Sequence, residues 1–115
     1  MSEIYDVSRA LAKALRESDE YLQYKKAREA AFEDDVTKNL LKQYHKMQLQ
    51  AQALVLSGKK DEDFMRQMQN IGEILQMNGN ASAYLTAEYK ISRLLGDVYK
   101  ILGDAIDVDL SALED

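Results

Sequence analysis

Residues 81–106 read ASAYLTAEYKISRLLGDVYKILGDAI, and this segment decides the fold class. Its apolar residues recur at spacings of three and four, which is typical of an amphipathic α-helix. One seam keeps a seven-residue repeat along the segment: Tyr84, Ile91, Leu95, Val98, Leu102 and Ala105. Further apolar residues widen the stripe on both sides, so one neighbouring helix is not enough to cover it. We therefore predict a long C-terminal helix that packs on two sides, with Leu95, Val98 and Leu102 as candidate interface residues.

Two glycines lie beside this seam, Gly96 and Gly103, one heptad apart. A glycine inside a helix costs about 1 kcal/mol relative to alanine. Two explanations stay open at this point: another backbone approaches closely there, or the positions are exposed and simply tolerate glycine.

The rest of the chain shows the same helical spacing, interrupted by capping signals. Three helix starts are marked by Ser18, Asp34 and Asp61. At these positions a side-chain oxygen can accept a hydrogen bond from a backbone N–H that has no partner within the helix. Gly58 ends a helix, because glycine readily adopts the left-handed cap conformation. The alternative at Asp34 is a bent but continuous helix. We expect an all-α antiparallel bundle of about five helices over residues 1–106, the longest at the C-terminus, followed by an acidic, disordered tail at 107–115.

The composition bounds the function. The chain has 115 residues, no cysteine, no proline and a net charge of −5, and no apolar run is long enough to cross a bilayer. Residues 58–115 carry six basic and eleven acidic side chains, whereas residues 1–57 carry nine of each. Such an acidic half repels phosphates and anionic lipids, which argues against nucleic acid or a membrane as the main partner. We expect a cytoplasmic protein.

Candidate catalytic groups are few. His45 is the single histidine, and it falls beside Lys46 on the polar side of its helix, so we expect a solvated side chain and no general base. The acidic clusters lie where helix capping already explains them. The sequence contains no Glu-x-x-His spacing and no glycine-rich phosphate loop. These features predict a protein that is not an enzyme and binds no metal or other cofactor.

A second apolar stripe, Leu49, Ala53 and Leu56, lies on the helix predicted to end at Ser57. Its spacings of four and three place it on one face, away from the main seam of that helix. The helices on both sides of Gly58 are rich in methionine and glutamine, which suits docking between helices. The stripe predicts either self-association into a homodimer or higher oligomer, or binding of an unidentified foreign protein.

The alternative function is RNA binding through residues 21–28, where Tyr21, Tyr24, Lys25, Lys26 and Arg28 interleave aromatic and basic side chains. Such a patch could stack on bases and neutralise phosphates. Acidic residues flank the segment on both sides, which favours an ordinary amphipathic helix.

The chain resembles the YlbF/YmcA family of small bacterial helical proteins, and within it the YheA-like branch. The matching residues are Tyr5-Asp6-Val7, Leu11, Ala14-Leu15-Arg16, Ser18, Glu20-Tyr21, Asp35, Gln48-Leu49-Gln50, Gly58, Leu85 and Ala87-Glu88. They span nearly the whole chain and include no catalytic signature.

The resemblance implies a non-enzymatic regulatory protein that forms a helical dimer or higher oligomer. Better-known members of the family act as accessory factors of a ribonuclease complex in RNA processing and in developmental control, and some are associated with iron–sulfur clusters through cysteines. Because this chain has no cysteine, the cluster is not carried over. The partners that the resemblance implies are a second copy of the chain and another protein, with such a ribonuclease complex as the candidate.

Overall fold

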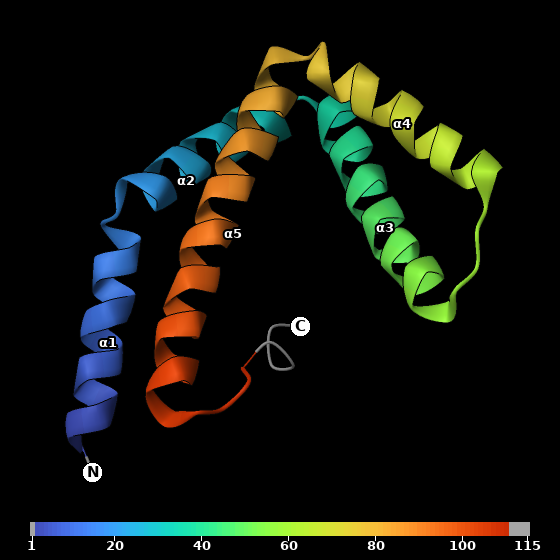
Figure 1. Ribbon diagram of the computed structural model, residues 1–115. Helices are drawn as coiled ribbons and strands as arrows, with labels where there is room; N and C mark the ends of the chain where they lie inside the picture. Colours follow the sequence, from blue (N-terminus) through green and yellow to red (C-terminus); the bar gives the residue numbers. More distant parts are fainter. Residues whose placement is uncertain (1, 111–115) are drawn as a thin grey trace. The chain divides into compact units, whose positions relative to one another are not determined.

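The computed structural model describes residues 2–110 and consists of five α-helices (Figure 1). The helices are α1 (Ser2–Arg16), α2 (Asp19–Phe32), α3 (Asp35–Ser57), α4 (Glu62–Gln76) and α5 (Gly79–Ile106). No strand occurs between residues 2 and 110. The predicted all-α fold and its longest helix at the C-terminus are confirmed.

The chain divides into two compact units. The central unit comprises residues 26–85, and the terminal unit combines residues 2–25 with 86–110 among those described. Helices α2 and α5 each run from one unit into the other, because the division falls within both of them. That residues 1–106 fold as one bundle, and that the tail is disordered, stay predictions.

The central unit is built on α3 and α4, which pack against each other as a helical hairpin (Figure 1). Leu41 of α3 and Leu75 of α4 are fully buried, and Met47 is buried as well. A row of rings adds to this core: the Tyr84 ring lies 5.5 Å from the Phe32 ring and 6.0 Å from the His45 ring. The large buried side chains of the described residues thus gather in this unit.

The helices begin close to the residues predicted from the sequence, because each N-cap hydrogen bond joins residues that are neighbours in the chain. The Ser18 hydroxyl accepts the backbone N–H of Tyr21, and the Asp61 carboxylate accepts that of Phe64. Asp34 is the N-cap of α3, which excludes a continuous helix through this point. Gly58 closes α3 at φ 72°, in the left-handed region. The predicted breaks are confirmed.

The terminal unit differs from the central one in having no large side chain in its interior. Its buried positions, among the residues described, are Ala87 and Gly103. Leu95 and Leu102, predicted as interface residues of the apolar seam, are 37% and 45% exposed within the chain. The segment is helical, as its periodicity predicted. Periodicity alone does not tell whether the helix that covers the seam belongs to the same chain or to another molecule.

The end of α5 explains one of the two glycines. Asp107 adopts φ 54°, the chain reverses, and the Val108 N–H donates to the Gly103 carbonyl over 3.0 Å. A Cβ on Gly103 would lie 2.6 Å from the Val108 carbonyl oxygen, whereas a Cβ on Gly96 would meet open space. Close backbone approach therefore accounts for Gly103 and does not account for Gly96.

Candidate protein-docking site

The stripe Leu49, Ala53 and Leu56, called here the α3 strip, lies on the exposed surface of α3. Leu49 is 68% exposed and Leu56 is 88% exposed. Leaving such large apolar side chains in water forgoes burial worth about 1.5–3 kcal/mol each. The structure thus brings the three predicted residues together on one accessible face of the central unit.

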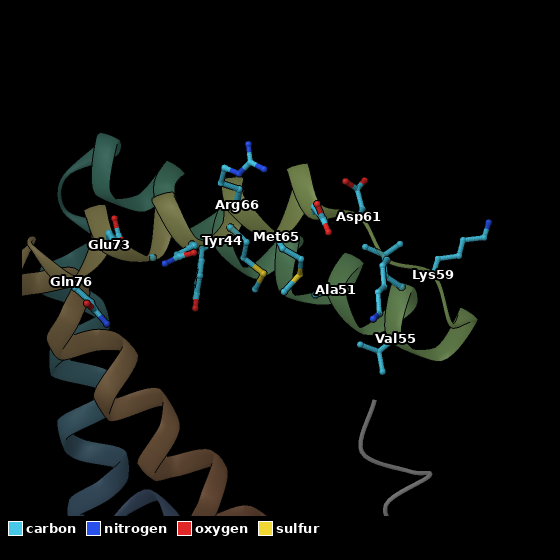
Figure 2. Close-up of a pocket in the computed structure, with 15 residues that line it drawn as sticks. Tyr44, Ala51, Val55, Lys59, Asp61, Met65, Arg66, Glu73 and Gln76 are labelled. Carbon is cyan, nitrogen blue, oxygen red and sulfur yellow. The ribbon is translucent and has the colours of Figure 1, made fainter.

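A groove between α3 and α4 was not predicted from the sequence. Its volume is about 1030 Å³, and its lining includes Tyr44, Ala51 and Leu54 from α3 and Met65 and Met68 from α4 (Figure 2). The two helices approach closely where a Cβ on Gly72 would lie 3.8 Å from the Tyr44 ring. Methionine side chains adapt to irregular surfaces, so a mostly apolar groove of this kind suits an incoming helix. The Met-rich composition of both helices was the signal that could have indicated it.

Charged side chains of both signs surround the end of the groove at the connection between the two helices. Lys59 and Lys60 lie on the connection, next to the N-cap Asp61. Arg66 pairs with Asp63 over 3.8 Å, and both side chains are mostly exposed. An exposed pair of this kind contributes at most about 1 kcal/mol. The charges at this end of the groove would therefore orient a bound helix more than they would tighten its binding.

The expectation of a solvated His45 is wrong. This side chain is half-buried, and its ring meets Tyr84 edge-on with the centroids 6.0 Å apart. Tyr84 comes from α5, so the contact joins segments that are distant in the sequence, and local polarity around Lys46 could not reveal it. The packing gives His45 a structural role in the central unit.

The five residues of the RNA-binding alternative all lie on α2. Tyr21 and Tyr24 are half-buried, which removes part of the stacking surface that bases need. The Arg28 guanidinium lies over the Phe32 ring at 5.0 Å from its centroid, a cation–π contact. Lys26 is turned about 140° around the helix from Tyr21 at 3.6 residues per turn. The patch is therefore less continuous than its sequence indicates.

Titratable groups show little that suggests catalysis. Over residues 2–110 no group of histidine, cysteine, aspartate or glutamate side chains could hold a metal ion. At Asp34, the hydrogen bond from the Thr37 hydroxyl is the largest cause that holds the pKa of the carboxyl below its ordinary value of 3.8. Asp34 is a helix cap, so this shift reflects structure and not a reactive site.

The described helices contain no segment long and apolar enough to span a bilayer. The fold and its surfaces define a class of small all-α proteins that expose apolar helix faces. Within that class, the chain belongs to the YlbF/YmcA family: the family model, described as control of competence regulator ComK, matches residues 4–107. The resemblance found in the sequence is confirmed.

Relatives match along nearly their whole length. The UPF0342 protein of Symbiobacterium thermophilum is 37% identical over 93% of this chain and 96% of its own length. The UPF0342 protein of Clostridium novyi is 36% identical, with 92% and 94% of the two chains covered. None of these names denotes an enzymatic activity.

Two solved structures share the fold. A protein of unknown function (DUF964) from Bacillus stearothermophilus has a TM-score of 0.75 and 21% identity, covering 90% of this chain and 92% of that one. A chain in the crystal structure of Bacillus subtilis RicA in complex with RicF has a TM-score of 0.61 and 20% identity, covering 92% and 95%.

Proposed function

We propose that this chain is a non-enzymatic adaptor that binds a partner protein through the α3 strip of the α3–α4 hairpin. The observation that carries the proposal is the exposure of Leu49 and Leu56 on α3. Another side of the same helix lines an apolar groove that also contains methionines of α4. An amphipathic helix of the partner suits such a surface, because apolar residues at spacings of three and four on both sides can interlock.

The family supports a regulatory role, and a structural neighbour was solved in complex with a second protein. We extend the proposal to a cytoplasmic accessory role in a ribonuclease complex, as the resemblance implies for better-known members. In such a complex the chain would act by holding other proteins in place.

The test is affinity purification of the full chain from its own cells, in three forms. The variant Leu49→Glu with Leu56→Glu places two charges that docking would have to desolvate, at a cost of several kcal/mol. The control Gln43→Glu with Gln50→Glu adds the same charge at exposed positions on other sides of α3. We expect one partner to be retained by the wild type and the control and lost by the strip variant. The same partners on all three forms would contradict the proposal.

RNA binding remains the second candidate, because Lys25, Lys26 and Arg28 are exposed on α2. If RNA were the ligand, changing all three to alanine would abolish binding and flatten its dependence on salt. The strip variant would then bind RNA normally. We expect instead that the wild type binds single-stranded RNA only weakly, with little difference in the triple variant.

A further inference from the structure

The exposed face of α3 that carries the strip does not end at Leu49. Toward the start of the helix, Lys46 and Lys42 continue the spacings of three and four, and Lys38 lies four residues before Lys42. A step of three or four residues covers about one turn of an α-helix, so all these residues share one face with the strip. We call Lys38, Lys42 and Lys46 the α3 lysines.

The α3 lysines are accessible and have no acidic partner. Lys42 and Lys46 are exposed, and Lys38 is half-buried. None of the three forms an ion pair within residues 2–110. The single acidic residue of α3 is Asp35 at its start, and residues 36–57 contain neither aspartate nor glutamate. In a chain with 20 acidic and 15 basic side chains, this helix is basic over nearly its whole length.

The lysines and the strip together have the spacing of a coiled-coil seam. Spacings of four, three, four and three join Lys42, Lys46, Leu49, Ala53 and Leu56. A helix packed along such a seam fits its own side chains between those of α3. From Lys38 to Leu56 the seam is about 27 Å long, so a helix of about five turns covers it.

The lysines determine which helix fits the seam. A docked helix takes the ammonium groups of Lys42 and Lys46 partly out of water, which is unfavourable unless each gains a carboxylate. In coiled coils a lysine on the seam accordingly sets the register and the choice of partner. The partner helix therefore needs aspartate or glutamate level with the two lysines and apolar residues level with the strip.

A second α3 does not meet this requirement. In a parallel pair each lysine lies beside its own equivalent, which is unfavourable. In an antiparallel pair that overlaps along the seam, Lys42 of one copy comes level with Leu56 of the other. Residues 36–57 supply no carboxylate in either arrangement. The seam thus favours a helix of a different sequence.

Nucleic acid and membranes suit the seam less well than an acidic helix does. Bases bind by stacking on aromatic side chains, and the seam contains none. A helix that lies on a membrane has its lysines on the polar face and its apolar residues on the other face. On α3 the lysines and the leucines lie on the same face, one set after the other.

We propose that this seam of α3 binds an acidic amphipathic helix of another protein, with carboxylates against Lys42 and Lys46 and apolar residues against the strip. The inference rests on the proposed function, because it names the chemistry of the partner that the α3 strip binds. The strip supplies the apolar burial, and the lysines select the partner and fix its register.

Two synthetic peptides test the chemistry of the partner. Both are helical, about 20 residues long to cover the seam, and have leucines at the spacing of the strip in one half. At the two positions level with Lys42 and Lys46, one peptide has glutamates and the other has lysines. Each is made with its apolar half first and with its apolar half last, because the seam does not fix the direction of the partner.

We expect the full-length chain to bind the glutamate peptide about tenfold or more tightly than the lysine peptide, because two attractions become two repulsions. Fluorescence anisotropy measures both affinities. The lysine variant, Lys42→Glu with Lys46→Glu, should reverse the preference. The matched control, Lys59→Glu with Lys60→Glu, changes the charge equally at exposed positions outside the seam and should keep it. Equal affinities for the two peptides, or no binding of either, would overturn the inference.

The native partner separates this inference from the proposed function. In the affinity purification described above, the lysine variant should lose the partner that the wild type retains, as the strip variant does. A partner that the strip variant loses and the lysine variant retains would refute the acidic helix and leave the proposed function intact. Single-stranded RNA and phosphatidylserine vesicles are the remaining probes. If the wild type binds either of them and not the glutamate peptide, and the lysine variant loses that binding, the seam serves another ligand and the inference fails.

Discussion

The side-chain amide of Asn78 donates a hydrogen bond to the Thr37 hydroxyl across 2.9 Å, although 41 residues separate them in the chain. Thr37 in turn donates to the Asp34 carboxylate over 2.7 Å, and Asn78 accepts the Ala81 N–H over 3.1 Å. The start of α3 and the start of α5 are thus joined by one chain of hydrogen bonds. Thr37 is 2% exposed, so its hydroxyl depends on these two partners.

Replacing Asn78 should therefore lower the free energy of unfolding by more than replacing an ordinary helix cap does. Asn78→Ala removes a cap, worth about 1 kcal/mol, and also leaves the buried Thr37 hydroxyl without its donor, a further loss of about 1–3 kcal/mol. The matched control is Asp61→Ala, which removes an exposed cap only. Urea unfolding of both variants measures the difference. Equal losses would show that the bond to Thr37 contributes nothing.

The stability of the protein should fall in acid through Asp34. The pKa of this carboxyl is lower in the folded chain than its ordinary value of 3.8, chiefly because of the hydrogen bond from Thr37. A depressed folded pKa contributes stability that is present above the unfolded pKa and is lost as the pH falls through the folded one. Relative to Asp34→Asn, we expect the wild type to lose stability below about pH 4, and to keep a constant difference between pH 5 and 7.

The control for this pH dependence is Thr37→Val, which removes the hydroxyl and keeps the shape of the side chain. Its stability should change less in acid than that of the wild type, because the main cause of the pKa shift is gone. Parallel acid curves for the wild type, Asp34→Asn and Thr37→Val would contradict the assignment.

The two glycines of α5 should respond in opposite ways to alanine. Gly96→Ala adds a methyl group in open space and removes the backbone freedom of glycine, so we expect about 1 kcal/mol of added stability. Gly103→Ala places its Cβ against the Val108 carbonyl and should destabilise the turn at residues 107–110. Thermal unfolding at one fixed protein concentration compares the two. Stabilisation by both substitutions would show that the turn can shift to accommodate the added methyl group at little cost.

Replacing a leucine of the central unit and replacing one of the terminal unit should both lower the stability. The two losses of stability should depend differently on protein concentration. Leu75→Ala removes a fully buried side chain and should cost about 2–5 kcal/mol at any concentration. Leu102→Ala removes a side chain that is 45% exposed within the chain. If a second copy covers this residue, the variant should have a lower Tm than the wild type at high protein concentration, and the difference should shrink on dilution. A loss of 2–5 kcal/mol for Leu102→Ala under monomeric conditions would mean that the chain buries this residue by itself.

The sequence allowed the helices and their ends to be predicted because these depend on neighbouring residues. Ser18, Asp34 and Asp61 each accept an N–H three residues ahead, and Gly58 adopts a conformation that glycine favours. The fold class and the family follow from the same local patterns.

Contacts between distant segments could not be read in this way. His45 was expected in solvent because its neighbours are polar, but its ring packs edge-on against a tyrosine of α5. The bond between Asn78 and Thr37 was missed for the same reason: nothing near either residue indicates the other. Leu95 shows the complementary limit, since its spacing predicts an apolar face without telling which molecule covers that face.

The uneven distribution of buried side chains sets an order of events in folding. Leu41 and Leu75 lie in the central unit, whereas the described residues of the terminal unit bury nothing larger than a methyl group. The central hairpin has contacts close in sequence and is the part that can form a nucleus. Leu75→Ala should consequently slow refolding, while Leu11→Ala on α1 should leave refolding unchanged and only speed unfolding. Helix α1 and the C-terminal half of α5 are then the last parts to become ordered and the first to be released.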